Sequence, residues 1–441
     1  MSEAKCEPDA VPATHEPKSH DPFFALIGSS EWNACIGAQA EAENYLDGYM
    51  EAAFELVDAV IEKRMHDKRD TLVLPILYNA RHAVELALKY TAGRLIDAKI
   101  LTGDAPLDHD IASAWQRLSE AHLPDAALRC HIDDLQPFVR SLASIDDDGQ
   151  ALRYVTRTDG TKSMEDRSLA NLEVIRVGLR VLARILDDLK HRTIDLVGEL
   201  WTGTFTAECS RSDLYAIAKK LPHKPAWTTD DFTGARAAVM AEYHLTSNAF
   251  SRAVNKIKVQ TELAGMIGIP SKPKHLTDEL AILAVEQWRR LHPPRIKKPD
   301  DLGLDYFAPR DFDAMQTSAD LEAEVAGIWR DTLTAPQLAD LEVIYYLGRN
   351  RQFCEAYPED LVKTLPLYQD GAQAPAKIRH LMEKTNLRDG LVTGLVLIGD
   401  RALADAYRPF DGLDGHCSRT YLRDPPAISA QGGKGGLSCS F

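Results

Sequence analysis

The feature of the sequence that most constrains its fold is a seam of apolar residues between Leu172 and Leu196. Its members recur in alternating steps of three and four, at Leu172, Ile175, Leu179, Leu182, Leu186, Leu189, Thr193 and Leu196. Such spacing places all of them along one side of an α-helix. At 1.5 Å per residue the helix is about 37 Å long. It must therefore pack lengthwise against neighbouring helices or against a partner chain.

The apolar pattern is helical in most other parts of the chain as well. Helical spacing recurs at 44–64, 75–96, 108–118, 319–333, 337–347 and 376–407. We expect the helix over 75–96 to begin near Pro75, where the missing N–H of proline costs nothing. No stretch alternates apolar and polar residues for long enough to indicate a sheet. The sequence therefore predicts an all-α protein.

A chain of 441 residues is long enough for two or three domains. Prolines among polar residues near the beginning, and glycines near the end, predict flexible tails. The segments expected are an N-terminal tail at 1–39, a helical bundle at 40–202, a basic helical block at 211–300, a helical C-terminal block at 301–420 and a tail at 421–441.

Charge is distributed unevenly. The whole chain has a formal net charge of -15, but residues 211–300 carry 15 Lys and Arg against 9 Asp and Glu, a net of +6. An anionic partner would approach this block most favourably. Chance clustering of charge is the alternative explanation.

Cysteine usage and hydropathy limit the class of protein. The seven cysteines are scattered and never form a C-x-x-C pair, which argues against a disulfide framework and against a zinc site. No apolar run approaches the ~20 residues needed to cross a bilayer. We expect a cytoplasmic protein with no metal, no cofactor and no membrane partner.

Three stretches of the first bundle carry a resemblance. They are TLVLPILYNARHAVELALKY at 71–90, DHDIASAW at 108–115 and LRYVTRTDG at 152–160, followed by the long helix. Together they resemble HEPN-type four-helix domains of prokaryotic defence and toxin systems. The resemblance covers about residues 40–202, and its most specific part is the Arg-His-x-x-Glu-x-x-x-Lys run from Arg81 to Lys89.

The resemblance implies a metal-independent endoribonuclease or a relative that has lost this activity. It also implies a homodimer and a protein partner encoded in the same operon. Active members use an Arg and a His with four to six residues between them, near the start of the last helix. Two pairs here have that spacing, Arg117 with His122 and Arg184 with His191, which is no more than chance would produce.

The site that the resemblance favours comprises five residues. His82 and His109 would carry protons, since histidine titrates near neutral pH. Arg81 and Arg153 would bind the phosphate whose charge grows in the transition state, and Glu85 would orient a histidine. The alternative is structural, because a buried Arg–Glu network that fixes helix register would select the same residue types.

A second candidate lies in the basic block, where residues 233–258 resemble a helix-turn-helix with the turn at His244 to Thr246. His244 occupies the position where such turns usually have a glycine. The second helix would bury Phe250 and Val254 and present its polar residues outward to RNA or DNA. These residues are Asn248, Ser251, Arg252, Asn255 and Lys256. Two packed helices without a nucleic-acid partner are the alternative.

Three functions therefore remain open from the sequence. They are a HEPN-like ribonuclease or its inactive relative, a non-catalytic nucleic-acid-binding regulator that uses residues 233–258, and a scaffold that dimerises through the seam.

Overall fold

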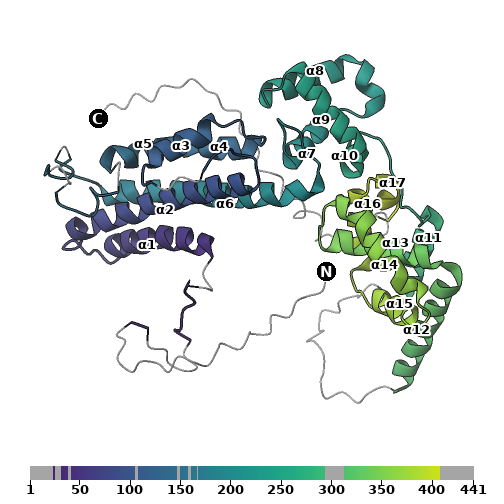
Figure 1. The fold of residues 1–441 in the computed structure, drawn as a ribbon. Coiled ribbons are helices and arrows are strands. Elements are labelled where there is room, and N and C mark those ends of the chain that lie inside the picture. Colours follow the sequence, from purple (N-terminus) through teal and green to yellow (C-terminus); the bar gives the residue numbers. More distant parts are fainter. Residues whose placement is uncertain are drawn as a thin grey trace. The chain divides into compact units, whose positions relative to one another are not determined.

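The computed structural model describes residues 23–24, 31–37, 41–104, 108–146, 149–156, 160–165, 167–293 and 312–407. The fold is all-α (Figure 1), as the apolar spacing predicts; the one β pairing among the described residues is an isolated bridge between Thr156 and Lys162. The C-terminal tail and most of the N-terminal tail expected from the sequence lie outside the described residues, as does the proline-rich stretch at 294–300.

The α-helices are α1 (Ala42–Glu62), α2 (Arg69–Asp97), α3 (Ile111–Glu120), α4 (Ala126–Asp134), α5 (Gln136–Ile145), α6 (Leu172–Glu199), α7 (Arg211–Lys220), α8 (Asp230–Glu242), α9 (Ser247–Val259), α10 (Thr261–Met266), α11 (Asp278–Leu291), α12 (Phe312–Thr332), α13 (Ala335–Arg349), α14 (Tyr357–Gln369), α15 (Ala374–Met382), α16 (Leu387–Leu397) and α17 (Arg401–Ala406). Short 3-10 helices among the described residues include η2 (Leu200–Thr202), η3 (Lys224–Thr228) and η4 (Cys354–Ala356).

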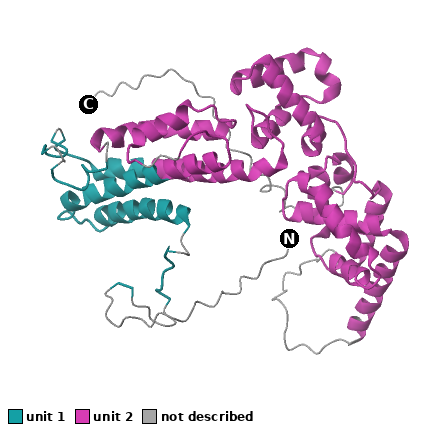
Figure 2. Cartoon of the chain, viewed as in Figure 1, with its two compact units in different colours: residues 1–86, 149–179 teal, residues 87–148, 180–441 magenta. Residues whose placement is uncertain are grey.

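The chain divides into two compact units, which Figure 2 colours separately. Unit 1 comprises residues 1–86 and 149–179, and unit 2 comprises residues 87–148 and 180–441. This division cuts across the segments expected from the sequence, since its boundaries fall within α2 and α6.

Unit 1 contains α1, the first part of α2 and the beginning of α6. Every third or fourth residue of α1 is buried, at Leu46, Met50, Ala53, Val57 and Val60. On its outer side, Arg176 of α6 donates to Glu62 over 2.6 Å and also pairs with Asp58. These ion pairs join the beginning of α6 to the end of α1.

Helix α2 begins earlier than its proline suggests. The sequence predicts a start near Pro75, but the helix begins at Arg69 and carries Pro75 inside it. A proline within a helix removes one hydrogen bond, in this case to the carbonyl of Thr71. Within the first turns of a 29-residue helix this single loss is tolerated.

The seam of α6 lies in the interior of the chain. Leu179, Leu182, Leu186, Leu189 and Leu196 are all buried, and only the first two seam positions are partly exposed. The seam therefore packs against neighbouring helices of the same chain. A partner chain on this side of α6 would have to displace those neighbours.

The core of the C-terminal helices in unit 2 depends on three glycines, at the crossing of α13 and α16. A Cβ added to Gly394 would lie 2.0 Å from the carbonyl oxygen of Ile344, and one added to Gly348 would lie 2.0 Å from that of Gly390. The two helices therefore touch backbone to backbone.

Among the described helices, none has both the length and the apolar composition needed to cross a membrane.

Candidate functional site

The Arg-His-x-x-Glu run lies on α2, where Arg81 and Glu85 are one turn apart. Arg81 Nη1 donates to Glu85 Oε2 over 3.1 Å, and the two side chains are only 1% and 5% exposed. A buried guanidinium paired with a carboxylate cannot contact a ligand that arrives from solvent. The structural interpretation of Arg81 and Glu85 is the one this geometry favours.

Gly149 lies against the Arg81 guanidinium. A Cβ at this glycine would lie 3.3 Å from Arg81 Nη1, and its φ of +80° belongs to the left-handed region. The Gly149 carbonyl accepts a hydrogen bond from Arg153 Nε over 2.5 Å. Gly149 thus lies close to the buried Arg81 and is hydrogen-bonded to the exposed Arg153.

His82 lies next to the buried pair but reaches solvent, with 23% of its side chain exposed. Its ring meets the edge of Tyr49 at a centroid distance of 4.3 Å and stacks on Tyr78 at 5.8 Å. Nδ1 lies 3.8 Å from Glu85 Oε2, which is too far for a hydrogen bond. Glu85 therefore lies near His82 but does not orient it through a hydrogen bond between these two atoms.

Arg153 completes an aromatic cluster in unit 1. Its guanidinium lies 5.8 Å from the centre of the Tyr78 ring and 5.5 Å from that of Tyr154, which is itself exposed. The aromatic cluster, as we name it, comprises Tyr49, Tyr78, His82, Arg153 and Tyr154. Only His82 and Arg153 of these belong to the predicted site.

The fifth predicted site residue, His109, belongs to unit 2. It precedes α3, where Asp110 is the N-cap and accepts hydrogen bonds from the N–H groups of Ala112 and Ser113 over 2.9 and 3.0 Å. Helix capping accounts for Asp110. The helix begins at Ile111, three residues later than the earliest start expected from the sequence, Asp108.

Helices α8 and α9 form the two-helix element expected in the basic block, beside α7 and α10 (Figure 1). Between them His244 adopts a φ of +55°, the left-handed conformation for which glycine is usual. Thr246 then caps α9 by accepting the N–H of Ala249 over 3.2 Å. The turn therefore closes without a glycine.

The orientation of α9 follows its apolar spacing. Phe250 and Val254 are buried, whereas the polar residues face away from the interior. Asn248, Ser251, Arg252 and Asn255 are exposed and Lys256 is half-buried.

The stretch of chain between the predicted segments 40–202 and 211–300, for which the sequence predicts no role, lies beside this polar face. We call residues 203–210 the connecting segment, because they join η2 to α7. Glu208 accepts a hydrogen bond from Arg252 Nη2, and Lys256 Nζ donates to the carbonyl of Gly203 over 3.0 Å. Between the segment and α9 lies an open hollow of about 450 Å³.

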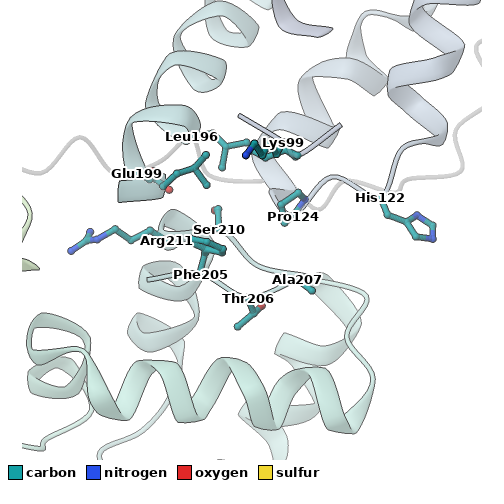
Figure 3. Close-up of a pocket in the computed structure, with 12 residues that line it drawn as sticks. Lys99, His122, Pro124, Leu196, Glu199, Phe205, Thr206, Ala207, Ser210 and Arg211 are labelled. Atoms are coloured by element: carbon teal, nitrogen blue, oxygen red, sulfur yellow. The ribbon is translucent and has the colours of Figure 1, made fainter. Parts of the chain in front are cut away.

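A smaller cavity of about 200 Å³ is also lined by residues 205–207 of the connecting segment (Figure 3). Two of its charged groups are engaged elsewhere: Glu199 accepts from Arg192 over 2.9 Å. Arg211 points away from the cavity and donates to Glu262 over 2.6 Å. We therefore place the candidate binding site at the larger hollow.

Buried ionisable side chains lie next to the connecting segment, on α6 and α7. Burial raises the pKa of the Asp213 carboxyl to about 8, and the nearby Asp125 adds to the rise. Backbone N–H groups of Ala126 and Ser210 act in the opposite direction. Burial opposes the charge of Arg192, yet Asp125 and Glu199 raise the pKa of this guanidinium above its ordinary value.

Among the described residues, no group of three or more His, Cys, Asp and Glu side chains is arranged to hold a metal ion. Comparison of the chain with models of known families, with curated proteins and with solved structures found no match.

Proposed function

We propose that this chain is a non-catalytic nucleic-acid-binding protein that uses the outer face of α9, and that its front part is an inactive HEPN-like relative. The observation that carries the proposal is the polar face of α9. Asn248, Ser251 and Arg252 are exposed on a helix whose opposite side is buried. This arrangement suits contacts to phosphates and base edges.

Charge supports the same proposal. Arg252 and Lys256 are one turn apart, so both cations lie on the same side of α9. They belong to residues 211–300, which carry 15 basic and 9 acidic groups in a chain whose net charge is -15. A polyanion is therefore attracted to this block and repelled by much of the remaining surface.

The inactive state of the HEPN-like part is inferred from burial and from position. Arg81 and Glu85 are buried and paired with each other. Near the start of α6, where the family has its Arg and His, Arg176 pairs with Asp58 and Glu62. No histidine occurs between His131 and His191.

The test is a binding titration of the full chain with labelled RNA and DNA at several salt concentrations. The double variant Arg252→Ala, Lys256→Ala should bind more weakly. Its slope of log affinity against log salt should be smaller by about 2, because two fewer phosphates are neutralised. The control is Arg330→Ala, Lys363→Ala, which removes two exposed cations from α12 and α14. Equal affinities and slopes for the two double variants would contradict the proposal.

A second candidate function is favoured by one observation, the exposure of His82 and Arg153 within the aromatic cluster. His82 and Arg153 both contact the ring of Tyr78. A histidine and a guanidinium are the groups needed to deprotonate a 2′-hydroxyl and to bind the phosphate. Tyrosine rings around them offer surfaces for base stacking. This would be ribonuclease chemistry without Arg81.

The ribonuclease candidate is tested with purified protein, mixed RNA and EDTA. Cleavage that is lost in His82→Ala and in Arg153→Ala would support it. His66→Ala, which changes an exposed histidine in the turn between α1 and α2, is the matched control. RNA that stays intact at high protein concentration would exclude the candidate and leave the binding proposal standing.

A further inference from the structure

The hollow beside α9 has walls of two kinds. One wall is residues 205–207 of the connecting segment, and the other is formed by Arg252, Asn255, Lys256 and Val259 of α9. Its volume of about 450 Å³ is within the 300–1,000 Å³ usual for ligand pockets. The hollow therefore has room for a small planar group.

The connecting segment is fastened on both sides of Phe205. Thr204 is buried and its hydroxyl donates to Glu355 Oε1 over 2.6 Å. Further along, the N–H of Thr206 donates to the carbonyl of Cys209 over 2.8 Å, and the N–H of Cys209 donates back to Thr206 Oγ1 over 3.0 Å. Phe205 itself is 40% exposed. The backbone on either side of Phe205 is thus held, and Phe205 lines the hollow.

The side chains around the hollow match the parts of one nucleotide. Phe205 offers an aromatic face for stacking, which every base can use. Asn255 carries an amide that both donates and accepts hydrogen bonds, as a base edge requires. Arg252 and Lys256 supply positive charge for a phosphate.

We propose that this hollow binds an unpaired nucleobase together with its adjoining phosphate. The outer face of α9 would then bind single-stranded nucleic acid. The inference rests on the proposed function and names its substrate class. Phe205 and Asn255 receive the base, while Arg252 and Lys256 receive the phosphate.

The geometry disfavours a duplex on the same face. An α-helix with its side chains is about 10–12 Å wide and a major groove about 12 Å wide, so a reading helix fills the groove. From Arg252 to Lys256, α9 has the connecting segment against its polar face, through Glu208 on Arg252 and Gly203 on Lys256. No space remains for both the helix and the segment inside one groove.

Glu208 occupies part of the phosphate position. Its carboxylate accepts from Arg252 Nη2, while 54% of the arginine side chain stays exposed. A bound phosphate would compete with this carboxylate for the guanidinium. Glu208→Gln keeps the shape of the side chain and removes its charge, and should therefore strengthen binding several-fold.

The experiment measures fluorescence anisotropy of the full chain with labelled 12-mers, as single-stranded RNA, single-stranded DNA and the matched DNA duplex. Single strands should bind more tightly than the duplex. Phe205→Ala should weaken single-strand binding about tenfold, and Phe205→Tyr should restore most of it. Tyr45→Ala, which removes an exposed aromatic ring from α1, is the control.

The outcomes separate this inference from the proposed function. A duplex that binds more tightly, with no effect of Phe205→Ala but weaker binding in Arg252→Ala, would overturn the single-strand inference and retain nucleic-acid binding at α9. Absence of binding to all three probes would overturn both. Comparison of the RNA and DNA arms identifies which sugar the face accepts.

Discussion

The carboxylate of Asp213 on α7 accepts a hydrogen bond from the backbone N–H of Ala126, the first residue of α4, over 3.1 Å. It also accepts from the N–H of Ser210 in the capping box that begins α7. One buried side chain thus supports the beginnings of two helices. Because burial raises the pKa of this carboxyl to about 8, its protonation has consequences for stability.

The first prediction concerns pH. The unfolded chain loses the Asp213 proton near its ordinary pKa of 3.8, while the folded chain keeps it up to about 8. The unfolded state then binds fewer protons, so the free energy of unfolding should fall as pH rises between these values. Asp213→Asn stays neutral and should lose this dependence. Urea unfolding at several pH values checks it, with the exposed Asp331→Asn as control. An equal slope in wild type and Asp213→Asn would refute the assignment.

The second prediction concerns the buried ion pair of α2. Arg81→Met leaves Glu85 buried without this partner and should cost about 3–5 kcal/mol of stability. The double variant Arg81→Met, Glu85→Leu removes both charges and should recover much of that stability. Chemical denaturation of the two variants is the measurement. If Arg81→Met were as stable as wild type, the pair would not be structural.

The third prediction compares two glycines within helices. Gly394→Ala should destabilise by about 2 kcal/mol or more, because the new methyl group would meet the Ile344 backbone at the α13–α16 crossing. Gly198→Ala on α6 meets nothing within 4 Å and should stabilise by about 0.5–1 kcal/mol. Melting temperatures that shift in the same direction would contradict the close crossing.

The fourth prediction concerns the seam. Leu182 is 2% exposed, so Leu182→Glu buries an unpaired charge and should cost about 3 kcal/mol or more. Val177→Glu, at a side chain 61% exposed on the same helix, should leave the fold intact. Circular dichroism during heating distinguishes the two. A well-folded Leu182→Glu protein would show that the seam is not interior.

Periodicity explains what the sequence could predict. The spacing of the seam and of Phe250 and Val254 determines which side of each helix turns inward, and the structure has these sides buried. Tyr78 was also within reach of this reasoning, because it lies four residues before His82 on the same helix.

The remaining features depend on contacts that spacing does not encode. Nothing near His82 in the sequence points to Tyr49, which comes from another helix. Likewise Glu208 and Phe205 lie more than forty residues before Arg252 and Lys256, in a stretch without regular structure. Periodicity assigns the inner side of a helix, but it does not say which distant segment will cover its outer side.

The position of Glu355 determines how the chain can be truncated. Its carboxylate accepts hydrogen bonds from Thr204, Arg211 and Gln260, three residues at least 95 positions earlier. A fragment truncated at residue 300 would keep those donors, all of them in or next to the basic block, and lack their shared acceptor. Removing the last third of the chain would therefore release Thr204 from its acceptor, and with it one of the two attachments that flank Phe205.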